Sequence, residues 1–151
     1  MKKLISRLLI ILVGLPLLLV LIAGATFLIV NRTNGSLESN GETRRYLLYM
    51  PESYDASVPT PLVICIHGFA QWPAHQLQIS GWTALADQHG FIVVCPMGTG
   101  FPLRWRAYGP PGSENDPMLE VNFISALIDQ LSRQYNIDPA RIYANGLSNG
   151  G

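Results

Sequence analysis

The feature that most constrains this chain is the run Gly146-Leu147-Ser148-Asn149-Gly150, which has the pattern G-x-S-x-G. In this pattern the serine occupies a strained turn between a β-strand and a helix, with its hydroxyl exposed. Residues 141–145 precede the run and predict the required strand. Gly146 and Gly150 flank the serine where larger side chains would clash in so tight a turn. We call residues 146–150 the serine turn; an inert glycine-rich turn is the alternative.

Ser148 is therefore the candidate nucleophile. A serine hydroxyl attacks poorly until a base removes its proton. In chains that use this turn, the catalytic acid and histidine follow the serine, in the order Ser, Asp or Glu, His. The sequence ends at Gly151. We therefore expect no catalytic acid or catalytic His in this chain, and a fold truncated after the nucleophile elbow.

The pattern of apolar residues predicts an α/β fold. Apolar runs at 62–66 and 91–95 are typical of strands buried on both faces, as in a parallel sheet. Helical spacing at 79–88 and 121–135 predicts a helix after each of these strands. Strand and helix therefore alternate up to the serine turn, which favours right-handed β-α-β units.

Turn signals divide the rest of the domain. Asn40-Gly41 is a strong hairpin signal between predicted strands at 36–39 and 42–50. Asp138-Pro139 predicts a turn before the last strand. Residues 97–117 form a long loop rich in glycine and proline, and loops of this length in compact domains are usually functional or disordered.

The N-terminal segment predicts export. Residues 8–30 are an uncharged apolar run of 23 residues, long enough to cross a bilayer as a helix. Lys2, Lys3 and Arg7 precede it, so the N-terminus is expected in the cytoplasm and the rest outside. A cleaved signal peptide is the alternative, since residues 23–25 have the A-x-A form of a cleavage site. We favour the anchor because apolar residues continue to position 30.

The expected organisation has three parts. Residues 1–30 are a membrane anchor or signal peptide, with membrane contact through residues 8–30. Residues 31–42 are a linker and the start of the first hairpin, and residues 43–151 are the N-terminal part of the α/β domain. From Thr33 onward the chain carries ten acidic residues against six arginines and no lysine. A nucleic-acid binder would show a basic patch, so we exclude that class.

His67, Gly68 and Phe69 follow the first buried strand. Backbone N–H groups in this position can stabilise the oxyanion of an acyl-transfer reaction by several kcal/mol. We expect the N–H groups of Phe69 and Asn149 to be the donors. His67 is expected to order the loop, with Gly68, and not to act as the base.

Other residues of chemical interest receive less specific roles. We expect His75 to be a loop residue and His89 to end a helix. Trp105, in the long loop, is expected either to wall a substrate cleft or simply to pack. Glu120 and Asp129 are expected to be solvated or capping residues. Cys65 and Cys95 are expected to be buried thiols, with a disulfide as the alternative in an exported domain. No metal or cofactor is implied.

Four segments together resemble a family. Residues 45–51 (Arg-Tyr-Leu-Leu-Tyr-Met-Pro), 62–68, 82–94 and 135–151 are similar to the polyhydroxybutyrate depolymerase-like esterases of the α/β-hydrolase superfamily. Feruloyl and acetylxylan esterases share the pattern, and the similarity covers residues 43–151, the N-terminal part only. Two positions depart from it: Leu119 stands where many members carry an acidic residue, and Phe69 where several carry a cysteine.

The resemblance implies a secreted or envelope serine esterase with the α/β-hydrolase fold. It implies cleavage of carboxylic esters of the polyhydroxyalkanoate, feruloyl or acetyl type through an acyl-serine at Ser148. Phe69 and Asn149 match the oxyanion donors by position, whereas no residue matches the catalytic acid or histidine. The alternatives are a serine peptidase of the prolyl-oligopeptidase type and a non-catalytic membrane-anchored fragment.

Overall fold

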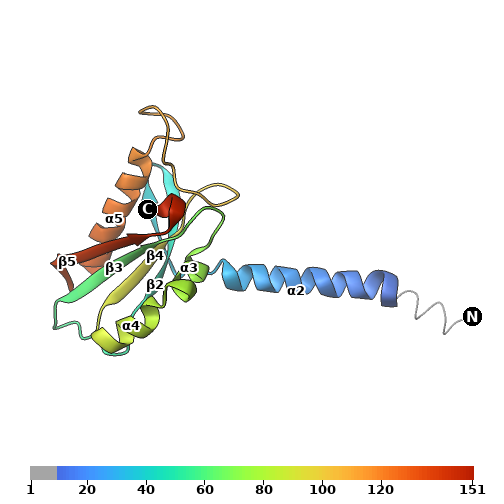
Figure 1. The fold of residues 1–151 in the computed structure, drawn as a ribbon, viewed down its shortest axis with the longest axis horizontal. Helices are drawn as coiled ribbons and strands as arrows, with labels where there is room; N and C mark the ends of the chain where they lie inside the picture. Colours follow the sequence, from blue (N-terminus) through green and yellow to red (C-terminus); the bar gives the residue numbers. More distant parts are fainter. Residues whose placement is uncertain (1–9) are drawn as a thin grey trace, which may run out of the picture. The chain divides into compact units, whose positions relative to one another are not determined.

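The computed structural model describes residues 10–151, which fall into two units, one ending at Asn31 and one spanning Arg32–Gly151. In the first, a π-helical turn η1 (Ile10–Gly14) continues into α2 (Leu15–Val30) (Figure 1). The joint helix, Ile10–Val30, has 21 residues and is long and apolar enough to cross a membrane, a test that a signal sequence also passes. The basic residues on which the predicted orientation depends, Lys2, Lys3 and Arg7, lie outside the described residues.

The second unit is built on one mixed five-stranded sheet in the order β1-β2-β4-β3-β5. Its strands are β1 (Gly35–Ser39), β2 (Glu42–Tyr49), β3 (Thr60–Ile66), β4 (Ile92–Pro96) and β5 (Ile137–Gly146). β3 runs parallel to both β4 and β5, which confirms the predicted parallel sheet. β1 and β2 form the predicted hairpin around Asn40-Gly41, and β2 joins β4 in the antiparallel sense.

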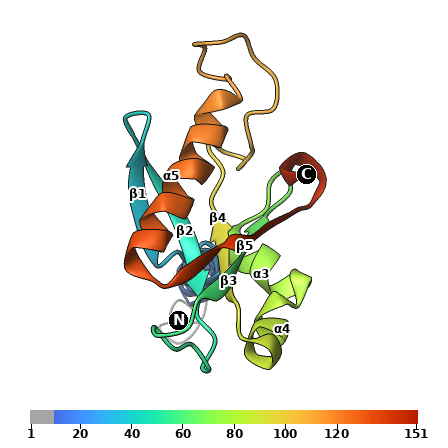
Figure 2. The same ribbon diagram turned by 90° about the vertical axis from the view of Figure 1, so that its left-hand side faces the viewer.

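Helices cover both faces of this sheet, with α5 (Met118–Gln134) on one side and α3 (Pro73–Ser80) and α4 (Trp82–His89) on the other (Figures 1 and 2). Successive residues of a strand point to opposite faces. In β4, Ile92 and Val94 accordingly join the core beneath α5, while Val93 and Cys95 join the core beneath α3 and α4. Burial on both faces is the reason that these strands are continuously apolar.

Two local predictions are wrong. The helix predicted at 79–88 is two helices, because Gly81, at φ 69°, takes the left-handed conformation that ends α3 and begins α4. The turn predicted at Asp138-Pro139 lies inside β5. It is accommodated there as an irregularity of the β3–β5 register, in which the Asp138 side chain accepts a hydrogen bond from the Ala140 N–H at 2.9 Å.

Both cysteines are free and fully buried, as predicted. Cys65 and Cys95 directly follow the paired residues Ile64 and Val94, and both belong to the core on the α3 side of the sheet. A hydrogen bond with Cys65 and burial raise the pKa of the Cys95 thiol. Their place in the core explains why two polarisable but weakly polar side chains occupy neighbouring strands.

β5 lies at the edge of the described sheet, and most of its residues are exposed. Tyr143, more than half exposed, stands opposite Val63 on this strand. A strand with an unpaired side and exposed apolar groups is a template for pairing with another chain.

We therefore expect residues 31–151, expressed alone, to self-associate, and Tyr143→Lys to reduce that association because a charge on an edge strand opposes edge-to-edge pairing. Light scattering on a size-exclusion column measures it. Gln88→Lys adds the same charge on the exposed side of α4 and serves as the control. Equal suppression by both variants would contradict a role for the β5 edge.

Candidate active site

The serine turn follows β5 directly. The chain leaves the strand at Gly146, and a single 3₁₀ turn, η2 (Ser148–Gly150), follows. Ser148 has φ 52°, in the left-handed region that costs a non-glycine residue about 1–2 kcal/mol. Such strain persists only where the surroundings enforce it, and it concentrates at functional sites. The turn is bound to β3 by a hydrogen bond of 3.2 Å from the Leu147 N–H to the Ile66 carbonyl.

Both glycines of the turn are required by close backbone contacts. A Cβ on Gly146 would overlap the carbonyl group of Gly150. A Cβ on Gly150 would lie 2.5 Å from the His67 carbonyl oxygen and 2.8 Å from Ile66 Cγ2. The pattern G-x-S-x-G thus reflects how tightly the serine turn packs against the end of β3.

His67 lies fully buried at the end of β3, with both ring nitrogens engaged. Nδ1 lies 2.7 Å from the Gly68 carbonyl oxygen, and the Gly98 N–H donates to Nε2 at 2.9 Å. A backbone N–H can only donate, so Nε2 carries no proton and Nδ1–H donates to the Gly68 carbonyl. Burial lowers the pKa of His67, against smaller opposing effects of the Gly68 carbonyl and the charge of Glu120. The imidazole is therefore neutral and fully used, which leaves no lone pair to act on the Ser148 hydroxyl.

The loop after His67 presents the first candidate oxyanion donor. Phe69 is exposed, and among residues 10–151 its N–H donates to no other group. Ala70, the next residue, has φ 56°, a second strained conformation beside the site, and its N–H donates to the Leu103 carbonyl at 2.8 Å. The Gly68 N–H donates to the Gln71 side chain at 3.1 Å, which closes the loop on itself. No residue type or spacing around Ala70 indicates this strain.

Trp105 hydrogen-bonds both to the end of β3 and to the serine turn. Its indole N–H donates to the His67 carbonyl at 2.7 Å, and its ring centroid lies 5.1 Å from that of His67. Its backbone N–H donates to the Asn149 side-chain oxygen at 2.8 Å. Trp105 is buried, so packing is its main role, yet it also borders a pocket of about 240 Å³ that Phe69 and Asn149 line.

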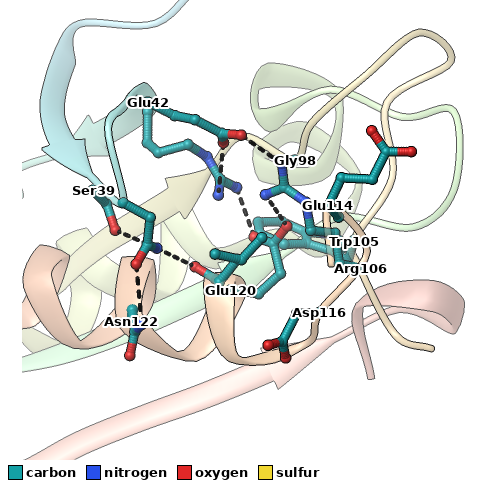
Figure 3. A network of polar contacts seen from close by, with 12 residues as sticks. Ser39, Glu42, Gly98, Trp105, Arg106, Glu114, Asp116, Glu120 and Asn122 are labelled. Atoms are coloured by element: carbon teal, nitrogen blue, oxygen red, sulfur yellow. Dashed lines mark hydrogen bonds and ion pairs between the residues drawn. The ribbon is translucent and has the colours of Figure 1, made fainter. Parts of the chain in front are cut away.

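A buried ion network lies behind Trp105 (Figure 3). Glu120 accepts from Arg44 at 2.7 Å and from Arg106 at 3.2 Å, and Arg106 also pairs with Glu42 at 2.7 Å. The Arg44 guanidinium stacks 4.0 Å from the ring centroid of Phe123. The expectation that Glu120 is solvated or a cap is wrong, because its buried carboxylate on α5 pairs with Arg44 of β2 and with Arg106 of the long loop.

The remaining candidate residues lie apart from the serine turn. His75 belongs to α3, not to a loop as expected, and His89 ends α4 as expected. Asp129 is exposed on α5. Within residues 10–151, no histidine or carboxylate hydrogen-bonds to the Ser148 hydroxyl, and no group of three or more His, Cys, Asp or Glu side chains could hold a metal ion.

These features define a class. A mixed sheet with helices on both faces, a strained serine turn after a parallel strand and a strained loop after its neighbour belong to the α/β-hydrolase fold, up to and including the nucleophile elbow. No family model matches the chain.

Relatives with known activities share this region. The chain is 32% identical over 118 residues to a bifunctional acetylxylan esterase/xylanase of Neocallimastix patriciarum, covering 78% of the chain and 16% of that protein. It is 27% identical over 137 residues to poly(3-hydroxyalkanoate) depolymerase C of Paucimonas lemoignei, covering 89% of the chain and 32% of that protein. A solved ferulic acid esterase superposes with a TM-score of 0.59 at 21% identity, covering 77% of the chain and 48% of that structure.

The chain thus spans about a sixth to a third of the length of these two relatives. The comparisons confirm the resemblance to polyhydroxybutyrate depolymerase-like, acetylxylan and feruloyl esterases. The names of these relatives and of this structure all include an esterase or a polyester depolymerase. The comparisons therefore do not favour the peptidase alternative.

Substitution of Gly150 tests the packing of the serine turn. We expect Gly150→Ala to lower the free energy of unfolding by about 3 kcal/mol, since the new methyl group meets backbone that cannot move aside. Gly81→Ala, where a Cβ meets nothing within 4 Å, should cost only about 1 kcal/mol from its positive φ. Urea denaturation compares the two, and equal costs would refute the close contact.

The pKa of His67 predicts a stability that depends on pH. In the unfolded chain His67 takes up a proton near pH 6.5, about the ordinary histidine value. In the folded protein its imidazole stays neutral to lower pH. Below pH 6.5 the unfolded state therefore binds more protons, and the free energy of unfolding falls as pH falls.

We expect His67→Gln to flatten this acid branch between pH 7.5 and 5.5, measured by urea denaturation at each pH. His89→Gln, which removes an exposed histidine, should retain it. A branch of the same slope in His67→Gln and the wild type would show that another group causes it.

Proposed function

We propose that this chain contributes the nucleophile and oxyanion side of a serine esterase that cleaves carboxylic ester bonds through an acyl-serine at Ser148. The observation that carries the proposal is the conformation of Ser148, which is held at φ 52° directly after β5 and beside the loop that follows β3. The names of the relatives support an ester substrate of the acetyl, feruloyl or polyhydroxyalkanoate type.

Each site residue has a role in this proposal. Ser148 Oγ attacks the ester carbonyl and displaces the alcohol. The N–H groups of Phe69 and Asn149 bind the oxygen on which negative charge develops, an interaction worth several kcal/mol per pair of donors. The free N–H of Phe69 and the shared pocket of Phe69 and Asn149 support this assignment. His67, Gly68, Gly146 and Gly150 shape the two loops.

The base that activates Ser148 is proposed to lie outside residues 10–151. The carbonyl of His67 lies against Gly150 of the serine turn, but both of its ring nitrogens are occupied. We propose that an Asp and a later His follow Ser148 in a longer chain, in the order that this fold uses.

The proposed location follows from the N-terminal segment. Residues 1–30 are proposed to be an uncleaved anchor with its N-terminus in the cytoplasm, which places residues 43–151 outside; cleavage after the A-x-A site would release the same domain. The uncharged helix Ile10–Val30 and the three basic residues before it support this orientation.

The test begins with the coding sequence beyond the codon for Gly151. A reading frame that continues with an Asp and a later His is expected, and the full-length protein should hydrolyse p-nitrophenyl esters. Ser148→Ala should lower kcat by about 10⁴-fold or more, because nothing else can form the acyl-enzyme. Residues 31–151 alone should show no turnover above the same variant. Robust turnover by residues 31–151 that Ser148→Ala abolishes would contradict the need for a downstream base.

A further inference from the structure

The two candidate oxyanion donors lie on different loops, and Trp105 hydrogen-bonds to both loops. Its indole N–H binds the carbonyl of His67, two residues before Phe69, at 2.7 Å. Its backbone binds the side chain of Asn149 in both directions, at 2.8 and 3.4 Å. Any displacement of Trp105 therefore changes the separation of the two donors.

Trp105 itself sits in a long loop between β4 and α5, and such a segment needs a fixed point. The next residue, Arg106, provides one. Its guanidinium bridges Glu42 at the start of β2 and Glu120 on α5, and its Nε donates to the Glu114 carbonyl at 2.7 Å (Figure 3). Its side chain is 7% exposed and that of Glu120 is 10% exposed, so their charge-assisted bond is shielded from water, whereas Glu42 is partly exposed.

The charges of this network balance. Glu120 also binds Arg44, which donates to the Met97 carbonyl at the other end of the long loop. Two arginines and two carboxylates thus connect β2, α5 and the long loop. A buried charge without its partner is strongly unfavourable, so an arrangement that separates Glu120 from its two arginines is disfavoured.

Resting on the proposed function, we propose that Arg106 and Glu120 are positioning residues: their buried ion pair fixes Trp105, and Trp105 sets the spacing of the Phe69 and Asn149 N–H groups around the oxyanion. Neither side chain contacts the reacting atoms. Removing either side chain is expected to destabilise the transition state by displacing the donors. It is expected to change substrate binding very little.

The main variant is Arg106→Gln in the full-length protein, because it leaves Glu120 paired with Arg44. Arg141→Gln is the matched control, since it removes an arginine from the exposed pair with Asp138. We expect Arg106→Gln to lower kcat by about 10- to 100-fold with KM changed less than about twofold, since removing a whole donor costs about 10²–10³. Arg106→Lys, which keeps the charge and reaches one carboxylate, should restore part of kcat.

A second readout separates positioning from loss of stability. The chain has three tryptophans, so three indole N–H signals report on it in a ¹⁵N spectrum. In Arg106→Gln the Trp105 indole N–H should exchange with solvent at least about tenfold faster, while those of Trp72 and Trp82 stay unchanged, because only its hydrogen bond to His67 is released. Should Arg106→Gln not fold, Glu42→Gln removes only the exposed partner of Arg106 and should show the same changes at smaller size.

The outcomes are distinct. Wild-type kcat in Arg106→Gln, a rise in KM alone, or equal acceleration of exchange at all three tryptophans would overturn the positioning role. If the wild-type full-length protein hydrolyses no ester, the proposed function fails and the positioning role fails with it. If the wild type is active and Arg106→Gln behaves like Arg141→Gln, only the positioning role fails.

Discussion

A buried, uncharged imidazole holds together the end of the sheet where the candidate site lies. His67 accepts from Gly98 through its ring, accepts from Trp105 through its carbonyl, and leaves Gly150 no room for a side chain. Two points of the long loop and the serine turn thereby meet at His67, the residue that directly follows β3. These contacts offset the strain of Ser148 and Ala70, because neither left-handed residue can relax without breaking a bond to this residue or its neighbours.

The fold was largely predictable because its strands are buried on both faces and its hairpin has a specific turn. The continuous apolar runs of β3 and β4 and the Asn40-Gly41 turn each allow one structure. The break at Gly81 was missed because helical spacing continues across it, and only the backbone angle reveals two helices. Pairing with β3 overrode the local turn preference of Asp138-Pro139, so that segment remained in β5.

The site was predictable where chemistry depends on backbone geometry and unpredictable where it depends on distant side chains. Ser148 and its flanking glycines carry a local pattern, and the structure supplies the contacts that require it. No local feature of the sequence distinguishes Glu120 from the solvated or capping carboxylates that amphipathic helices usually carry. Its partners, Arg44 and Arg106, lie 76 and 14 residues away along the chain, and no local pattern records such pairing.

The proposed reaction has two requirements, stabilisation of the oxyanion and removal of the Ser148 proton. The described residues provide for the first and not for the second. Stabilising an oxyanion needs fixed dipoles, and the described residues supply contacts that fix the loops of Phe69 and Asn149, from Trp105 to both loops and from Leu147 to Ile66. Removing a proton from Ser148 needs a base with a free lone pair, and His67 gives both of its nitrogens to holding the loops. His67 therefore cannot act as the base, because both of its ring nitrogens are needed to hold the loops that carry the oxyanion donors. The oxyanion donors must be rigid, whereas the base must keep a free lone pair. A fold that takes the donors and the base from different segments of the chain can satisfy both requirements.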